Sequence, residues 1–588
     1  MYVAITGSGK ARVVQFREDT RIPGTGKKKT NVIETLGNYE KMIAEDPDII
    51  AKLKQQAKEI TLERKQNRAP LSIQLPVKDI EHPSDLTPSF LFGHALVNQL
   101  WKSMTLDKFF TENCGKRNAE AVAQALYYLV AHRCSKPASI NASVAEQNNY
   151  AGVKPLGSDL FYEVLDVLAD QKDDIVKHLC SFFKKKTDRN GPEAYYDVTT
   201  YAFESTRWGE LRMFGFSKDH KNNEVQVVMG LLLDNNGIPI TYELFPGNTM
   251  DQNTLKKAVD NLKALYKLDK ITIVADKGLN SGKNLEYLCS EEHDFVISYT
   301  LKCSPESFKM LIFDQEDWQE SIDKETQEVY YRSKVVSQNL EVKVALQPED
   351  ESAPKKRGRP KKYKTEQIPV NIHLTWSAKR AAKDRGDRER MITRLRKRLD
   401  KPYQLKALLK RGCNQYLQME LDTDTWSIDE EKITSAAKYD GYYAIITNNL
   451  ELSTEKACTI YRDLWKIEES FRVLKTDLKA RPVFVWTDKH ICGHFAMCYI
   501  SLCLLRYAQY IFWQKNQEEL PAARVMEAIN KPLALVQGEF PANVVTPTRV
   551  PQCYLDLAEL LKLPPLKSNM TLTQFRKSTK LDLSINIG

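Results

Sequence analysis

Residues 271–278 read Ile-Thr-Ile-Val-Ala-Asp-Lys-Gly, a short strand of mainly Ile, Val and Ala character that ends at the carboxylate of Asp276. Open α/β sheets place their ligand chemistry at the carboxyl ends of central strands, so Asp276 is a candidate functional residue. A turn or capping role is the alternative for this residue considered alone.

The segments on either side of this strand predict an α/β order. Strand-like runs precede it at Ala194–Thr200, Glu224–Leu233 and Pro239–Leu244, and a helix is expected over about Asp251–Tyr266. Another helix and the strand Phe295–Tyr299 follow it. We therefore predict a mixed sheet with helices.

The pattern returns further along the chain, after a long interruption. Residues 301–440 hold the β-like runs Glu328–Val335 and Leu340–Leu346 and basic segments, which we interpret as an insertion into the sheet domain. Strand-like Gly441–Thr447 then restores the α/β order, and a long helix is expected from about Thr454.

The first 86 residues predict a small separate module. Strand-like runs occur at Tyr2–Ile5, Ala11–Phe16 and Thr30–Leu36, Lys27–Lys29 fall in a turn, and a helical pattern runs from about Tyr39 to Lys65. The module is either a reader of DNA ends or an ordinary β-rich cap.

A chain of 588 residues is too long for one core, and about three or four domains are expected. The predicted division is as follows: N-terminal module 1–86, helical region 87–190, sheet domain 191–300 and 441–515, insertion domain 301–440, and a C-terminal tail region 516–588 too irregular to assign.

Charge is concentrated in one segment. The whole chain carries a formal charge of +9, whereas residues 377–411 alone hold fourteen Lys and Arg against four Asp and Glu, a net of +10. This indicates a polyanionic partner at a particular surface, and a solvated basic helix is the simpler alternative.

Other features point to a soluble, intracellular protein. The eleven cysteines form no CxxC pair, which fits a reducing compartment. The N-terminus lacks a signal-peptide pattern. The apolar stretch Ile491–Trp513 is interrupted by His494 and Arg506 and is interpreted as a buried core helix, because a membrane span needs about 20 apolar residues.

A second candidate carboxylate, Asp197, lies mid-strand between aromatic and β-branched residues. Burying a carboxylate there is costly unless it is paired or bound to a metal.

Helix geometry supplies a third. At about 100° per residue, one apolar stripe faces the core. Its members are Leu464, Ile467, Phe471, Leu474 and Leu478. Tyr461, Glu468 and Lys475 recur every seven residues at the edge of that face, whereas Glu469 is expected to point into solvent. A surface Glu–Lys ladder is the alternative for this second stripe.

Three carboxylates are hard oxygen ligands that suit Mg²⁺ or Mn²⁺. Two such ions about 4 Å apart can activate an attacking oxygen and stabilise a leaving one in phosphoryl transfer. We assign Asp197 to bridge both ions and Asp276 and Glu468 to complete one each. Lys475 and Tyr461 are assigned to backbone phosphates.

Together these residues resemble the DDE transposases of bacterial insertion sequences. The likeness rests on the strand-borne Asp197, on Asp276 followed by Lys-Gly, and on the run Tyr461-Arg-Asp-Leu-Trp-Lys-Ile-Glu468-Glu-Ser-Phe-Arg-Val-Leu-Lys475. It covers about 194–300 and 441–505 and is to the group with a Tyr-Arg-Glu-Lys signature. The resemblance implies a ribonuclease H-like fold and cut-and-paste movement of the element's own DNA by a dimer.

The signature's arginine position holds Leu464 here, so that phosphate contact is missing or supplied elsewhere. Lys466 and Arg472 are assigned to DNA binding as well. The resemblance implies double-stranded DNA as partner, both terminal inverted repeats and target, bound by a homodimer in the bacterial cytoplasm.

Lys355–Lys362 resembles an AT-hook, in which Arg357 and Arg359 would enter a narrow A·T minor groove. A plain charged linker is the alternative. Arg residues alternate with Ile392, Leu395 and Leu399 in the basic stretch, which predicts a phosphate-facing amphipathic helix.

The leading hypothesis is therefore a metal-dependent transposase that cleaves element ends and joins them to target DNA. A ribonuclease H-like nuclease without strand transfer is one alternative. A domesticated DNA-binding protein is the other, and it predicts a lost carboxylate, whereas all three are present.

Overall fold

The computed structural model describes residues 1–21, 28–66, 73, 75, 79–82, 86–113, 118–187, 193–217, 223–266, 270–302, 304–345, 363–399, 416–420, 425–538 and 543–581. The chain forms two compact units. One comprises residues 1–79 with 537–543, and the other comprises residues 80–536 with 544–588.

The first unit is a three-stranded antiparallel sheet with two helices. Its elements are β1 (Tyr2–Thr6), β2 (Val13–Arg21), β3 (Lys28–Asn38), α1 (Tyr39–Glu45) and α2 (Ile49–Gln66). All three expected strands are confirmed. Lys28 and Lys29 begin β3 instead of lying in the turn, and Lys27 lies outside the described residues. The expected helix is divided in two around Pro47, whose nitrogen carries no hydrogen to donate.

The centre of the second unit is a mixed sheet. Its first five strands are β5 (Glu193–Ala202), β6 (Gln226–Leu233), β7 (Pro239–Pro246), β8 (Thr272–Ala275) and β9 (Asp294–Ser298). Their spatial order is β7-β6-β5-β8-β9, in which β5, β8 and β9 are parallel and β6 and β7 are antiparallel to their neighbours. This order is that of a ribonuclease H-like sheet, so the predicted fold class is confirmed.

Four further strands extend the same sheet beyond β9. They are β15 (Tyr442–Thr447), β12 (Tyr363–Ser377), β11 (Val329–Ala345) and β10 (Gln319–Ile322), all antiparallel to their neighbours. The two β-like runs expected after residue 328 form the single long strand β11. The predicted insertion thus adds strands to the sheet edge and also carries α11 (Glu306–Phe313), α12 (Ala378–Leu399), β13 (Leu417–Glu420), β14 (Thr425–Ile428) and α14 (Glu430–Ala437).

Helices cover both faces of the sheet. Helix α9 (Leu255–Tyr266) packs against β6 and β7, and α10 (Gly282–Ser290) packs against β9 and β11. The other face carries α15 (Thr454–Arg462), α16 (Trp465–Arg472) and the π-helical turn Val473–Asp477. The long helix expected from Thr454 is therefore interrupted at Asp463–Leu464.

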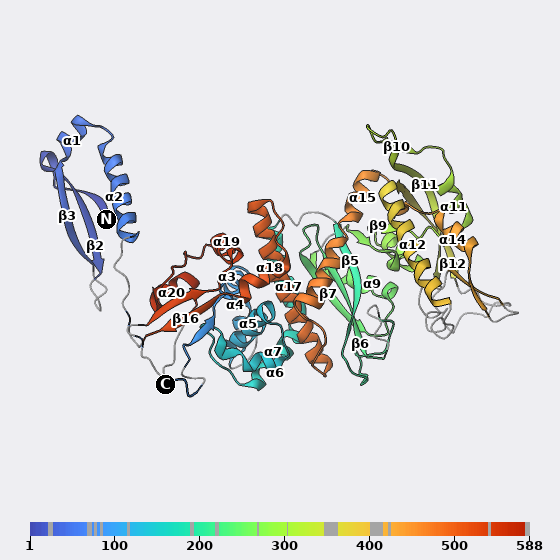
Figure 1. The fold of residues 1–588 in the computed structure, drawn as a ribbon, viewed down its shortest axis with the longest axis horizontal. Helices are drawn as coiled ribbons and strands as arrows, with labels where there is room; N and C mark the ends of the chain where they lie inside the picture. The colour runs from blue at the N-terminus through green and yellow to red at the C-terminus, as the bar shows by residue number, and fades with distance from the viewer. Residues whose placement is uncertain are drawn as a thin grey trace. The chain divides into compact units, whose positions relative to one another are not determined.

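Helix α17 (Asp488–Asn516) lies between β7 and the helices α5 and α7 (Figure 1). Among the described residues it is the one helix whose length and composition would allow it to cross a membrane, and 89% of its most apolar window is buried in the fold. The expectation of a buried core helix agrees with this burial, which explains its lack of a polar face.

Six helices lie within residues 87–190, where helical periodicity was expected. They are α3 (Ala95–Ser103), α4 (Leu106–Asn113), α5 (Ala119–Ser135), α6 (Ile140–Ala145), α7 (Ser158–Asp170) and α8 (Lys172–Lys186).

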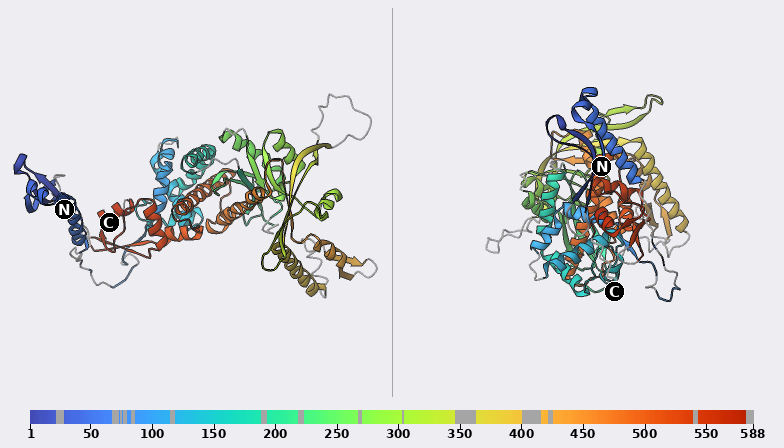
Figure 2. Two further views of the ribbon diagram at one scale, coloured as in Figure 1. Left: turned by 90° about the horizontal axis from the view of Figure 1, so that it is seen from above. Right: turned by 90° about the vertical axis from the view of Figure 1, so that its left-hand side faces the viewer.

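The tail, which the sequence left unassigned, packs beside these helices (Figure 2). It forms α18 (Ala522–Asn530), β16 (Leu533–Gln537), β17 (Val544–Thr548), α19 (Gln552–Leu560), β18 (Met570–Thr571) and α20 (Leu572–Thr579). Strand β4 (Ser89–Leu91) pairs with β16, which joins both ends of this unit in one four-stranded sheet.

Candidate active site at the ends of the parallel strands

Asp197, Asp276 and Ser298 form a row across three parallel strands. Tyr196 of β5 pairs with Ala275 of β8, so the next residues, Asp197 and Asp276, are neighbours on the same sheet face. Asp276 directly follows β8 with an extended backbone, and its Oδ1 accepts a hydrogen bond of 3.1 Å from the Ser298 hydroxyl. Asp197 is half-buried, and its Oδ1 accepts from the Val198 amide at 2.7 Å.

Tyr461 of α15 also donates a hydrogen bond to Oδ1 of Asp276. Its hydroxyl lies 3.3 Å from Asp276 Oδ1, and its ring is 5.7 Å from that of Tyr443. Burial raises the pKa of the Tyr461 phenol well above its usual value, and the nearby Tyr443 and Asp276 act in the same direction. Tyr461 therefore stays protonated and remains a hydrogen-bond donor.

Glu468 lies in the same recess as Asp276. This recess, called here the carboxylate recess, has a volume of about 840 Å³ and is lined by Asp276, Glu468 and Tyr461 among others. Glu468 is exposed to it, while the apolar stripe is buried as predicted, from Leu464 to Leu478.

The helix that carries Glu468 runs over β5. Helix α16 packs against β5 and β6. Burial raises the pKa of Tyr195 and the nearby Asp463 carboxylate acts in the same direction, while the Lys475 ammonium lies 5.5 Å from the centre of the Tyr201 ring. Tyr195 and Tyr201 flank Asp197 on its own face of β5, because side chains alternate along a strand. Glu468, between Asp463 and Lys475, therefore lies on the helix turn above the Asp197 face.

The three carboxylates fit a hard divalent cation by donor chemistry, since all are oxygen ligands. Two observations bring these carboxylates together. The strand register makes Asp197 and Asp276 neighbours, and Asp276 and Glu468 line the same recess. In the part of the chain that the structure describes, no three His, Cys, Asp or Glu side chains are grouped as a metal site. The three carboxylates thus lie on one side of the sheet but do not form a compact group of metal ligands.

Glu469 corrects one expectation. Instead of pointing into solvent, it forms an ion pair of 2.9 Å with Arg506, and its side chain is 22% exposed. Arg506 of α17 is buried and also donates to the Ser470 hydroxyl at 2.8 Å. The amphipathic pattern failed here because a single-helix pattern does not include α17, whose Arg506 contacts both Glu469 and Ser470.

The predicted DNA-binding side chains have different surroundings. Lys466 donates to Asn235 O at 2.7 Å and to Asp463 at 2.8 Å, so it ties α16 to the β6–β7 turn. Arg472 is exposed and pairs with Glu469 and Asp477. Lys475 lies over the Tyr201 ring, on the Asp197 side of the sheet. Arg357 and Arg359 lie outside the described residues.

The insertion supplies a wall of the carboxylate recess that the sequence did not reveal. Arg388 of α12 pairs with Asp440 through both of its terminal nitrogens, at 2.5 and 2.6 Å, and the pair is largely buried. The Arg380 guanidinium lies 4.3 Å from the centre of the Tyr443 ring. A basic stretch alone does not distinguish such inward-facing arginines from surface ones. Ser298 was also missed, although its place at the end of the neighbouring predicted strand was a usable signal.

Helix α12 carries a separate stripe of exposed cations. At 100° per residue, five of them fall within an arc of about 60° on the side away from the buried Leu395. They are Lys379, Lys383, Arg390, Arg394 and Lys397. The helix therefore presents one face to the carboxylate recess and another, strongly basic, face to solvent.

Residues 196–504, more than half of the chain, match the family model of the transposase DDE domain. A piggyBac transposase synaptic complex with hairpin DNA is similar at 9% identity and a TM-score of 0.33, covering 84% of this chain and 83% of that one. The Mos1 transposase paired-end complex with the left transposon end has 12% identity and a TM-score of 0.13, covering 41% and 66%. No curated protein sequence matches the chain.

Proposed function

Since the chain belongs to the family with a transposase DDE domain, whose chemistry is phosphoryl transfer at DNA, we propose that it is an insertion-sequence transposase that cleaves the ends of its own element and joins them to target DNA. We place it in the group with a Tyr-Arg-Glu-Lys signature around Glu468. The observation that carries the proposal is the row of Asp197 and Asp276 on adjacent parallel strands, with Glu468 in the recess above.

In this proposal Asp197, Asp276 and Glu468 would hold Mg²⁺ or Mn²⁺, which would supply charge stabilisation for the attacking and leaving oxygens. Ser298 and Tyr461 orient Asp276 through the hydrogen bonds they donate to its Oδ1.

The substrate that we propose is double-stranded DNA, first the terminal inverted repeats and then the target. Its phosphates would lie along the exposed cations of α12, beside the carboxylate recess. Lys475, on the Asp197 side of the sheet, would contact a phosphate near the cut. A homodimer would hold two DNA ends in the bacterial cytoplasm, associated with the nucleoid.

The test uses the full chain with Mg²⁺ and labelled duplexes taken from the DNA that flanks its coding region. The expected products are cuts at the element ends and, with a supercoiled plasmid present, joined molecules. Asp197→Asn, Asp276→Asn and Glu468→Gln should each abolish both products and leave DNA binding in place. Cutting without joining would indicate a nuclease, and binding without either would indicate a DNA-binding protein.

Asp387→Asn is a matched control for these variants. Asp387 also lines the carboxylate recess, but it belongs to α12 and pairs with Arg390. Its replacement should leave cutting within about twofold of the wild type, because exposed ion pairs contribute about 0–1 kcal/mol. Loss of cutting in Asp387→Asn, with activity kept in Glu468→Gln, would contradict the assignment.

A further inference from the structure

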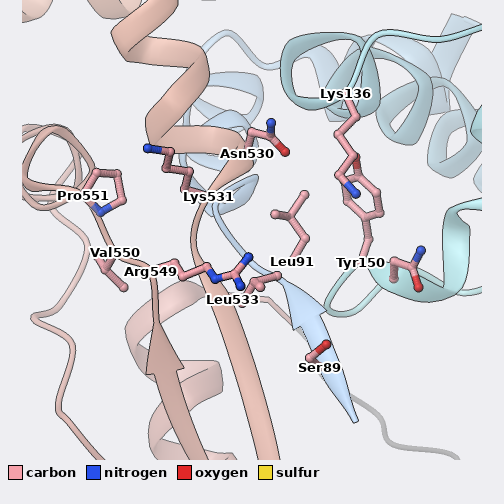
Figure 3. Close-up of a pocket in the computed structure, with 11 residues that line it drawn as sticks. Ser89, Leu91, Lys136, Tyr150, Asn530, Lys531, Leu533, Arg549, Val550 and Pro551 are labelled. Carbon is pink, nitrogen blue, oxygen red and sulfur yellow. The ribbon is translucent and has the colours of Figure 1, made fainter. Parts of the chain in front are cut away.

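A second recess lies outside the sheet domain, where the helical region meets the tail. It has a volume of about 730 Å³ and is called here the cationic recess. Lys136 comes from the end of α5, Lys531 from the end of α18, and Arg549 from the segment after β17. Figure 3 shows Lys531 and Arg549 on one side of Leu91 and Lys136 with Tyr150 on the other.

None of the eleven described residues that line the cationic recess is acidic. The carboxylates that pair with its lysines, Glu146 with Lys136 and Glu527 with Lys531, lie outside the lining of this recess. Lysines that end helices are common because they interact with the helix dipole. That explanation does not apply to Arg549, which follows a strand and forms no ion pair with a described residue.

Two smaller recesses continue from the cationic recess. The first, of about 400 Å³, shares Lys136 and Asn530 with it and adds Lys479. The second, of about 220 Å³, shares Lys479 with the first and adds Arg481. Besides the buried Arg133, five cations thus line three adjoining recesses, and Glu146 is the one carboxylate among the described lining residues. We call this series the cationic track.

The middle of the cationic track lies just after the segment that carries Glu468. Lys479 comes two residues after the π-helical turn that follows α16. The buried Arg133 fixes this point, because it donates to the carbonyl oxygens of Leu478 and Lys479 at 3.3 and 3.2 Å. The chain that leaves the Glu468 helix therefore passes directly into the lining of the cationic track.

We propose that the cationic track binds the phosphate backbone of duplex DNA next to the segment that is cut. The proposal rests on the proposed function only in taking DNA as the polyanion. Successive cations with almost no carboxylate suit a ligand with regularly repeated negative charge. Polar Ser89, Asn149 and Asn530 between the cations can donate further hydrogen bonds to phosphate oxygens.

The experiment measures binding of the full chain to a 50-base-pair flanking duplex in Ca²⁺-free, Mg²⁺-free buffer at several salt concentrations. The variant is Lys136→Ala/Lys531→Ala/Arg549→Asn; asparagine is chosen because Arg549 has φ of +53°, which asparagine tolerates. The slope of log K against log salt is negative, and each lost phosphate contact should reduce its steepness by about 0.9. The slope of the variant should therefore be shallower by about 2 to 3.

The control variant removes three exposed lysines elsewhere in the tail region, Lys562→Asn/Lys567→Ala/Lys577→Ala, and changes the net charge equally; asparagine is again used at the positive-φ position, since Lys562 has φ of +55°. Its slope should match the wild type, and DNA should protect Lys136 and Lys531 from acetylation. An unchanged slope in the first variant, or equal losses in both, would overturn the proposal. No step of this assay needs cleavage, so a chain that binds in this way and never cuts would contradict only the proposed function.

Discussion

The two recesses of the larger unit differ in charge and in origin. The carboxylate recess combines Asp276 and Glu468 with arginines and many tyrosines, and it is built from the sheet, the Glu468 helix and the insertion. The cationic recess has Lys136, Lys531 and Arg549 and no described acidic residue, and it is built from the helical region and the tail. One arrangement suits metal-assisted chemistry on a phosphodiester, and the other suits holding the phosphates on either side of it.

This difference assigns catalysis to one recess and DNA binding to the other. Carboxylates repel DNA unless cations neutralise them, so the carboxylate recess cannot supply much affinity by itself. A purely cationic surface attracts any duplex and has no group that activates a nucleophile. If both assignments are correct, variants in one recess should leave the property of the other almost unchanged.

The largest expected effect comes from Asp197→Asn/Asp276→Asn. Losing both strand-borne ligands should lower the single-turnover cleavage rate by about a thousandfold or more, since metal stabilisation of a phosphoryl-transfer transition state is worth several kcal/mol. Metal-free DNA affinity should stay within about threefold. The Lys136→Ala/Lys531→Ala/Arg549→Asn variant should bind DNA more weakly but keep the wild-type cleavage rate once DNA is saturating. Parallel losses of rate and affinity in both variants would remove the distinction between the recesses.

Acid should destabilise the region around the cationic recess. Burial lowers the pKa of His94 and His132 to about 4, and that of His494 to about 3. A folded pKa below the unfolded value of about 6.5 means that these groups stabilise the fold above pH 6.5, and that this contribution is lost as pH falls toward 4. Each should cost about 3 kcal/mol by pH 4, at 1.36 kcal/mol per pKa unit.

Hydrogen exchange between pH 7 and 5 measures this locally, after correction for the intrinsic rate. Protection of α3, α5 and α17, which carry these histidines, should fall before that of β6 and β8, whose residues are buried and include no histidine. His494→Asn tests the assignment further, because it removes the residue with the lowest pKa and should flatten the pH dependence. Equal loss of protection in sheet and helices would indicate some other titration.

Most of the sheet could be predicted because its strands are short apolar runs between clear breaks. Residues such as Ile273 and Val274 are buried on both faces, as their composition indicated. The tail could not be predicted, because β16, β17 and β18 are short and their sheet is completed by β4, which pairs with β16 from more than 400 residues earlier. Pairing of that kind depends on tertiary contacts that leave no local pattern.

The candidate site was predictable to the level of its three carboxylates and no further. Strand position indicated Asp197 and Asp276, and helix periodicity indicated Glu468. The surroundings of Lys466 and Glu469 depend on Asn235 and Arg506, which lie in other elements, so sequence spacing assigned them to DNA or to solvent. Their ion pairs explain why a basic or acidic residue near a site is a poor guide to its role.

A smaller effect is expected from Glu469→Gln, which tests whether Glu468 or its neighbour is the catalytic glutamate. This change leaves the buried Arg506 without its ion-pair partner, and the free energy of unfolding in urea should fall by about 2 kcal/mol. Cleavage at 25 °C should remain close to wild type. Glu468→Gln should abolish cleavage and leave the free energy of unfolding unchanged. A Glu469→Gln protein that is stable but inactive would mean that the helix assignment is off by one residue.

The smallest effect concerns Tyr461, for which sequence and structure suggest different roles. Its spacing from Glu468 predicted a phosphate contact, whereas its hydroxyl lies 3.3 Å from Asp276 Oδ1 and so positions a carboxylate. Removing one hydrogen bond of about 1 kcal/mol in Tyr461→Phe should slow single-turnover cleavage about fivefold without weakening DNA affinity. Tyr439→Phe is the control, since Tyr439 lines the same recess and packs against Phe313. If Tyr461→Phe instead weakens DNA binding and leaves the cleavage rate at saturating DNA unchanged, Tyr461 contacts a phosphate and is a DNA-binding residue.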